Sequence, residues 1–382
     1  MAISILHATT FQVGALTAVE FSPFVIFGLP AGAIIDRLPR RPVLMTADVG
    51  RALALASVPI AYAFDVLSYA QLVVVVFVTG SLTVFFDVAY QSILPALVER
   101  EQLADGNAKL EVSRSAAQTA GPGIAGLLIE LLGAATAVTV DAASFVISAL
   151  FIRRIRAAEP PIEQVDADDR GLRRLVREIR EGLRYVLGHH TLRLIAGSTA
   201  TSNFFSSMSM AVFLLYAVRE RGYSAGVVGL IFAIGNVGAL LGAVVAQRLT
   251  RAVRLGPAIV LGMLLGSLGT LILGLAPVSH AAVYFVGAWL LFGFGGVLYN
   301  IDQVSLRQAI TPPRMQGRMN ASMRFMVWGT MPFGSLVGGA FGTALGLRPT
   351  LVVAGIGGLT AVVWLLGRPV LSLVEIPEPA SS

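Results

Sequence analysis

The residues most capable of chemistry in this chain are ionisable side chains inside long apolar stretches. Glu20, Asp87, Arg114 and Asp302 each lie within such a stretch. A charged group placed there costs free energy and usually marks a functional site. A carboxylate that lines a polar cavity could bind and release a proton near neutral pH. These four residues are therefore the candidate cavity and proton-coupling residues.

Three further charges in apolar stretches have simpler interpretations. Asp48 and Arg51 are three residues apart, so they would share one face of a helix and form a structural ion pair. Asp141 falls near the outer end of its stretch, where it could cap a helix. Neither interpretation requires a direct role in chemistry.

Several other kinds of site lack their residues. The chain has no cysteine, which excludes disulfides and thiolate-based sites. The sequence shows no glycine-rich phosphate loop and no nucleophile elbow. An intramembrane enzyme would need His, Asp or Ser side chains clustered at one depth, and no such cluster is evident. We therefore expect no cofactor and no metal site, since the histidines do not group either: His7, His189, His190 and His280.

Composition identifies the elements that must position these charges. Hydrophobic residues make up 55% of the chain, charged residues 13%, and the mean hydropathy is +0.78. Soluble domains carry about 25% charged residues. The net charge of +6 comes from arginines between apolar segments, which favours membrane orientation over nucleic-acid binding.

Eleven apolar stretches predict eleven transmembrane helices in an all-α membrane protein. Most reach the roughly 20 residues that a helix needs to cross a bilayer. Because backbone polar groups must be satisfied within lipid, such stretches are expected to be helical. The predicted spans are 11–35, 43–64, 69–97, 107–132, 134–152, 191–217, 224–247, 256–276, 281–310, 318–345 and 349–371.

Basic residues predict the orientation of these spans. Arginines gather in alternate loops, as at 37–41, 153–193, 248–254 and 307–318, and those loops are expected to be cytoplasmic. If the loop at 37–41 is cytoplasmic, the span before it must begin outside the cell, and so must the chain. Met1–Ala8 is too short to be an additional span that would bring the start back inside. Ala2–Leu6 has the composition of a helix end, so we expect a first helix to precede Met1.

The middle of the chain predicts a division into two halves. Residues 153–190 are rich in charge, and apolar residues recur at helical spacing from Leu172 to Leu187, opposite a row of arginines. This pattern is typical of a basic amphipathic helix on an anionic leaflet, and a solvated linker helix is the alternative. The expected parts are an N-terminal bundle (1–152), a cytoplasmic linker (153–190) and a C-terminal six-helix bundle with a short tail (191–382).

The two halves also share sequence features. The segment 37–40 reappears at 248–251, and Gly106 and Gly317 are separated by the same offset. Pro122 and Pro332 are one residue out of that register. Paired repeats are a recurrent architecture of membrane transporters, with the substrate site near the bilayer midplane.

Two motifs resemble those of a known family. Residues 32–41 (GAIIDRLPRR) resemble the signature loop between the second and third helices of the major facilitator superfamily, with Pro39 where that family usually has glycine. The resemblance implies a role in conformational locking for Gly32, Asp36, Arg37, Arg40 and Arg41. The second motif, at Gly121, Pro122 and Gly126, resembles a Gly-Pro helix motif that is associated with exporters in this family. The alternative interpretation is a kink that serves helix packing.

The chain from Phe11 onward is similar to the branch of that superfamily containing the enterobactin exporter and macrolide efflux proteins. Residues 85–92 (FFDVAYQS) and 107–111 (NAKLE) carry this resemblance, together with Arg114. It implies a two-bundle fold with pseudo-symmetric halves and a truncated first helix. The chain lacks the superfamily's usual arginine motif in the fourth helix, around 79–81.

These observations predict a secondary transporter in the cytoplasmic membrane. We expect it to export a small amphiphilic molecule, drug-like or siderophore-like, by alternating access and proton antiport. The expected partners are that substrate, protons and the lipid bilayer, and the protein is expected to be a monomer that binds no nucleic acid. An importer or uniporter of the same fold, or a transport-inactive membrane partner, is the alternative.

Overall fold

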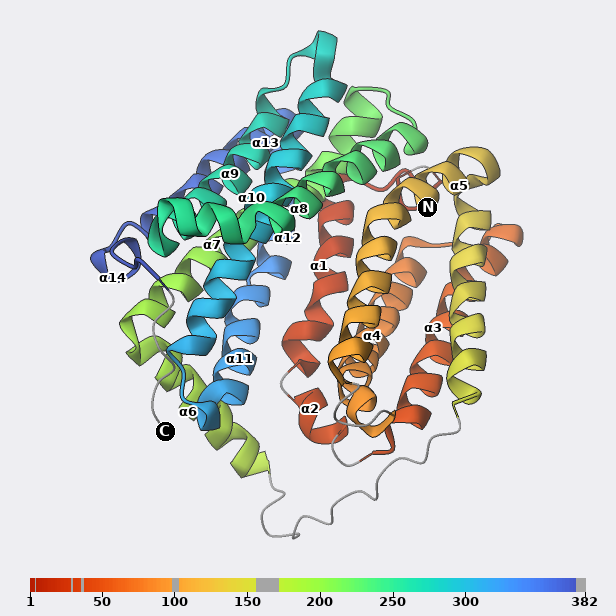
Figure 1. The fold of residues 1–382 in the computed structure, drawn as a ribbon. Helices are drawn as coiled ribbons and strands as arrows, with labels where there is room; N and C mark the ends of the chain where they lie inside the picture. Colours follow the sequence, from red (N-terminus) through yellow and green to blue (C-terminus); the bar gives the residue numbers. More distant parts are fainter. Residues whose placement is uncertain (4, 29, 36–37, 98–102, 156–171, 376–382) are drawn as a thin grey trace. The chain divides into compact units, whose positions relative to one another are not determined.

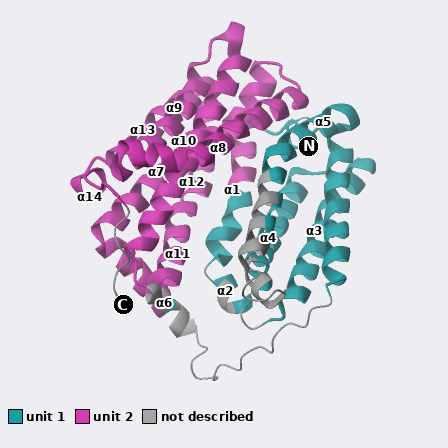
Figure 2. Ribbon diagram, viewed as in Figure 1, with its two compact units in different colours: residues 1–8, 19–176 teal, residues 9–18, 177–382 magenta. Residues whose placement is uncertain are grey.

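The structure is a computed structural model that describes residues 1–375 apart from 4, 29, 36–37, 98–102 and 156–171 (Figure 1). Every regular element in this part of the chain is helical, which confirms the predicted all-α class. The chain divides into two compact units, coloured separately in Figure 2. Unit 1 comprises Met1–Ala8 and Val19–Val176, and unit 2 comprises Thr9–Ala18 and Arg177–Ser382.

Unit 1 is built around helix α3, which packs against both α4 and α5. A small buried core in this unit contains Ile35, Leu44, Ala89 and Ile93. Its elements are the second part of α1 (Thr10–Phe27), then α2 (Pro30–Ile35), α3 (Arg40–Ala63), α4 (Tyr69–Leu97) and α5 (Leu103–Arg153).

Gly133 interrupts α5 between the two spans that the sequence predicted at 107–132 and 134–152. Its backbone has φ 83° and ψ 159°, which are not helical values. Glycine adopts positive φ readily because it has no Cβ, whereas other residues there would be strained. The prediction of two helical segments meeting at this position is confirmed.

Unit 2 contains most of the remaining helices and the first part of α1. Within this unit, a Cβ placed on Gly14 of α1 would lie 2.7 Å from the Cα of Gly339, so the two backbones approach closely. Helix α6 (Leu172–Gly188) belongs to this unit from Arg177 onward. The other elements are α7 (His190–Leu215), the π-helix η3 (Tyr216–Glu220), α8 (Ala225–Val253), α9 (Leu255–Leu275), the short η4 (Val278–His280), α10 (Ala281–Ala309), α11 (Pro313–Trp328), α12 (Met331–Leu345), α13 (Leu347–Val363) and α14 (Arg368–Leu371).

Rows of glycine bring the helices of unit 2 together. A Cβ on Gly238 of α8 would lie 2.1 Å from the carbonyl oxygen of Leu290 in α10. A Cβ on Gly334 of α12 would lie 2.1 Å from the carbonyl oxygen of Phe204 in α7. Small residues allow such close backbone approach between membrane helices. The glycine rows of α8 and α12 therefore pack these helices together.

The helix predicted over 318–345 is broken, so the prediction of one continuous helix is wrong. Gly329 and Thr330 separate α11 from α12, and Pro332 lies in the first turn of α12. Proline has no N–H to donate, and its ring disfavours a continuous helix. The carbonyl of Val327 accepts hydrogen bonds from the Asn203 amide at 2.9 Å and the Thr330 hydroxyl at 3.0 Å. These side chains donate hydrogen bonds to a backbone carbonyl group next to the helix break.

Eight helices in the described residues are long and apolar enough to cross a membrane. One of them, Ala116–Arg153, is 38 residues long and includes the interruption at Gly133. Helices α12 and α13 are shorter, with 15 and 17 residues. The membrane architecture is therefore confirmed, but length and composition do not establish the predicted number of eleven spans.

Candidate functional site

A buried arginine organises the polar interior of unit 1. Arg51 and Asp48 lie one turn apart on α3, are 6% and 1% exposed, and form an ion pair. The guanidinium of Arg51 also donates to Thr83 Oγ1 of α4 at 3.3 Å. It lies 4.2 Å from the ring centroid of Phe86 and 4.4 Å from that of Phe145, in cation–π geometry. The predicted ion pair is confirmed, and it connects three helices.

Two more carboxylates act on the same guanidinium. Asp87 of α4 and Asp141 of α5 both interact electrostatically with Arg51. All three residues lie about three helical turns from the neighbouring helix ends at Arg40, Leu97 and Arg153. We call Arg51, Asp48, Asp87 and Asp141 the Arg51 cluster.

The position of Asp141 corrects an expectation. The sequence placed it near the outer end of its span, as a possible helix cap. Helix α5 continues through this residue on both sides, with the nearest interruption at Gly133. Asp141 therefore lies in the middle of a helical segment and does not cap a helix end. It interacts electrostatically with Arg51.

The other candidate coupling residues do not join this cluster in the described part of the chain. Glu20 is exposed on α1, and its carbonyl would lie 3.1 Å from a Cβ on Gly80 of α4. The described carboxylates that act on Arg51 are Asp48, Asp87 and Asp141. Arg114 belongs to α5, but its side chain lies outside the described residues.

Asp302 occupies a separate polar position in unit 2. It is 5% exposed on α10, and its two carboxylate oxygens lie 3.0 and 2.9 Å from the Thr250 hydroxyl of α8. Thr250 belongs to the repeated segment 248–251 that the sequence pairs with 37–40. One turn before Asp302, the hydroxyl of Tyr299 lies 2.6 Å from that of Thr199 in α7.

The signature loop is partly described. Gly32 lies in α2, and Arg40 and Arg41 begin α3, whereas Asp36 and Arg37 lie outside the described residues. Arg41 donates a hydrogen bond to the carbonyl of Arg153 at the end of α5. Within unit 1 this contact joins the ends of two helices that the arginine distribution assigns to the cytoplasmic side.

The Gly-Pro motif lies in uninterrupted helix. Pro122 is inside α5, whose described non-helical residue is Gly133. A Cβ on Gly121 would have no atom within 4 Å, while Gly126 is buried. Close packing against other described residues therefore does not explain why position 121 is a glycine.

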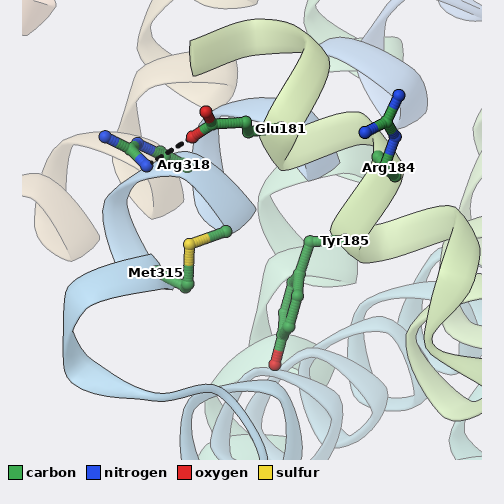
Figure 3. Close-up of a pocket in the computed structure, with 5 residues that line it drawn as sticks. All are labelled: Glu181, Arg184, Tyr185, Met315 and Arg318. Carbon is green, nitrogen blue, oxygen red and sulfur yellow. Dashed lines mark hydrogen bonds and ion pairs between the residues drawn. The ribbon is translucent and has the colours of Figure 1, made fainter. Parts of the chain in front are cut away.

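A cavity of about 680 Å³ opens between α6 and α11 in unit 2 (Figure 3). Glu181 of α6 forms an ion pair with Arg318 of α11 at 2.6 Å. Arg184, Tyr185 and Met315 complete the lining. The sequence indicated the basic helix but not this cavity, because the α11 residues are more than a hundred positions away.

His189 connects α6 to α7. Its Nδ1 lies 3.4 Å from the backbone N–H of Leu192 and caps the start of α7. Burial, and then the neighbouring charge of His190, lower the pKa of His189 below its ordinary value. The neutral ring, which can accept this hydrogen bond, is therefore the favoured form near neutral pH.

No group of three His, Asp or Glu residues that could hold a metal occurs among the described residues.

Similar proteins are transporters. The chain is 29% identical to the multidrug efflux pump Tap of Mycolicibacterium fortuitum over 371 residues, which cover 93% of this chain and 85% of Tap. It is 26% identical to the enterobactin exporter EntS of Escherichia coli O127:H6 (strain E2348/69 / EPEC) over 350 residues, covering 90% of this chain and 78% of EntS.

Solved structures share the fold. A bacterial homolog of the human lysosomal transporter Spinster superposes with a TM-score of 0.72 at 13% identity, covering 95% of this chain and 90% of that one. The nucleoside transporter NupG gives a TM-score of 0.70 at 13% identity, covering 96% of this chain and 92% of NupG. The family profile described as Major Facilitator Superfamily matches residues 1–330. The chain therefore belongs to the Major Facilitator Superfamily and is a multi-pass membrane transporter rather than an enzyme.

Proposed function

We propose that this transporter exports a small amphiphilic molecule from the cytoplasm in exchange for protons. Residues 1–152 and 191–382 would act as the two bundles, and 153–190 as the cytoplasmic linker. Two observations favour the outward direction: the relatives Tap and EntS are named as an efflux pump and an exporter. A multidrug pump and a siderophore exporter both favour an amphiphilic substrate class.

The observation that carries the proposed proton coupling is the Arg51 cluster. Three carboxylates act on one guanidinium within unit 1. If all three were ionised, the cluster would hold excess negative charge in a setting of low dielectric constant. Neighbouring carboxylates that cannot all ionise retain a proton on one of them. The cluster is thus a place where a proton can bind and leave without a second cation.

Asp87 is the proposed proton carrier within this cluster. Asp48 is already committed to its ion pair with Arg51 on the same helix. Asp87 comes from another helix, so a change in the packing of α3 and α4 would alter its distance from Arg51. A longer distance weakens the attraction that favours the charged form, and protonation follows. Arg51 would then act as a positioning residue. Glu20 and Asp302 remain alternative carriers.

The proposal can be tested in everted membrane vesicles, where export appears as uptake into the lumen. The vesicles are energised by an imposed pH gradient and offered a panel of dyes, macrolides and siderophores. We expect uptake of at least one compound, and its loss when the gradient is collapsed. Uptake only by right-side-out vesicles would favour an importer, and gradient-independent equilibration would favour a uniporter. No movement of any compound in either orientation would favour a transport-inactive partner.

A further inference from the structure

Helix α6 packs its apolar side against its own unit. Val186 is fully buried in a core that includes Met319 and Met323 of α11. A Cβ on Gly182 would lie 2.6 Å from the carbonyl oxygen of Arg318, so the two helices touch through their backbones. The Tyr185 hydroxyl donates to the carbonyl of Ile310 at 3.3 Å. This part of the apolar face is therefore occupied by protein.

The side of α6 that is turned away from this core presents arginines, and Arg184, at the edge of that side, also borders the cavity between α6 and α11. Arg177, Arg180 and Arg184 are exposed, and their spacing of three and four residues puts them on one helix face. Val176 and Leu187 are 54% and 49% exposed beside this stripe. An exposed row of cations flanked by apolar side chains is the surface that an anionic lipid interface binds.

The chain's connections put α6 directly next to the end of a membrane-crossing segment. Only His189 separates α6 from α7, which begins a membrane-crossing segment at His190. Similarly, α11 begins at Pro313, shortly after the span ending at Ala309. The arginine distribution puts these ends on the cytoplasmic side, where membranes are rich in anionic lipid.

The cavity between α6 and α11 lies next to this arginine-bearing side of α6. Arg184 and Arg318 line it from the two helices (Figure 3). Arg318 is engaged by Glu181, whereas Arg184 has no ion-pair partner within the described ranges. We propose that this cavity binds the phosphate headgroup of an anionic phospholipid of the cytoplasmic leaflet, with Arg184 as its principal ligand and Glu181 as a competitor for Arg318. This inference does not depend on the proposed direction or coupling of transport.

The test is native mass spectrometry of the full-length protein in detergent, titrated with phosphatidylglycerol and, separately, with phosphatidylcholine. We expect phosphatidylglycerol to bind more tightly. Loss of one arginine contact weakens binding by about fivefold, so Arg184→Gln should raise the Kd for phosphatidylglycerol by about that factor. Arg251→Gln removes an exposed arginine on α8 with the same charge change and should leave the Kd unchanged.

Glu181→Gln separates a headgroup site from a purely structural contact. If Glu181 competes with lipid for Arg318, this variant should bind phosphatidylglycerol more tightly than the unaltered protein. If the ion pair only holds α6 in place, Glu181→Gln should not tighten binding, and that result would overturn the proposal. Equal affinity for the two lipids would overturn it as well. Displacement of phosphatidylglycerol by millimolar inorganic phosphate would contradict a lipid as the occupant and indicate a soluble anion.

Discussion

At the scale of single residues, Arg51 has more partners than its spacing predicted. It lies three positions after Asp48, and that spacing predicted only a local ion pair. The structure retains the pair and adds Thr83, Phe86 and Phe145 around the guanidinium. Loss of one partner of a buried ion pair costs about 3–5 kcal/mol because the other charge is left uncompensated. The contribution of the Asp48 pair to stability is therefore a sufficient explanation for that pair.

The residue-scale prediction concerns Asp87. Asp87→Asn retains the shape of the side chain but removes its titration, so transport driven by a pH gradient should fall to background. Downhill exchange of substrate should continue, because that reaction requires no net proton movement. Initial rates of both reactions in proteoliposomes provide the measurement. Asp65→Asn is the matched control, since Asp65 is an exposed residue between α3 and α4.

Other outcomes would assign the coupling elsewhere. Retained pH-driven accumulation in Asp87→Asn would exclude this carboxylate as the carrier. Loss of that accumulation in Glu20→Gln or Asp302→Asn, with exchange intact, would identify the alternative. A parallel loss of both reactions in Asp87→Asn would instead indicate a structural role.

At the scale of elements, helix packing in unit 2 depends on positions where only glycine fits. The Cβ of an alanine at 238 would meet the backbone of Leu290 at 2.1 Å, and backbone cannot move aside as a flexible side chain can. Gly296 of α10, by contrast, has no atom within 4 Å of its Cβ position. An alanine at 238 therefore tests the packing requirement, and an alanine at 296 tests helix propensity alone.

The element-scale prediction compares these two glycines. Gly238→Ala should destabilise the protein by about 1–3 kcal/mol, because overpacking forces α8 and α10 apart. Gly296→Ala should be neutral or stabilising by up to about 1 kcal/mol, since alanine favours helix more than glycine does. Thermal unfolding of the purified variants in one detergent provides the comparison. Equal melting temperatures for Gly238→Ala and the unaltered protein would show that the helices can separate without cost.

At the scale of the whole molecule, the proposed transport by alternating access would require the two proposed bundles to exchange conformations. The resemblance of residues 32–41 to the family's signature loop assigns part of that control to Asp36 and its neighbouring arginines. Within unit 1, the bond from Arg41 to the carbonyl of Arg153 shows that this region also ties helix ends together. We therefore predict that the loop affects both conformational locking and local stability.

The whole-molecule prediction separates those two effects. Asp36→Asn should lower the transport rate at least tenfold, equivalent to about 1.4 kcal/mol, while membrane insertion and the melting temperature stay unchanged. Quantified protein in the membrane fraction and substrate flux per molecule are the measurements. Pro39→Gly, which restores the residue usual in the family, is the companion variant and should retain transport. Normal flux in Asp36→Asn would place this residue among ordinary helix-end carboxylates.

Much of the fold could be predicted from the sequence because its causes are local. A run of apolar residues must form a helix in lipid whatever its neighbours are, so hydropathy located most helices to within a few residues. Gly133 interrupts α5 at its predicted position because positive φ is a property of that one residue. The glycine rows of α8 and α12 were also readable, since their helical spacing puts small residues on one face.

The tertiary structure alone determined which charges meet and where the cavity lies. Helices that are apolar on all sides carry no strong signal for how they rotate about their axes, so hydropathy could not show that Asp87 and Asp141 interact electrostatically with Arg51. The amphipathic pattern of α6 shows which of its sides is apolar but not which helix covers that side. The ion pair of Glu181 with Arg318 of α11, across 137 positions, therefore could not be predicted from the sequence. The break before α12 was missed because the polar groups that make it tolerable come partly from Asn203, on another helix. Contacts of this kind depend on helix register and rotation, which are properties of the packed bundle rather than of any one segment.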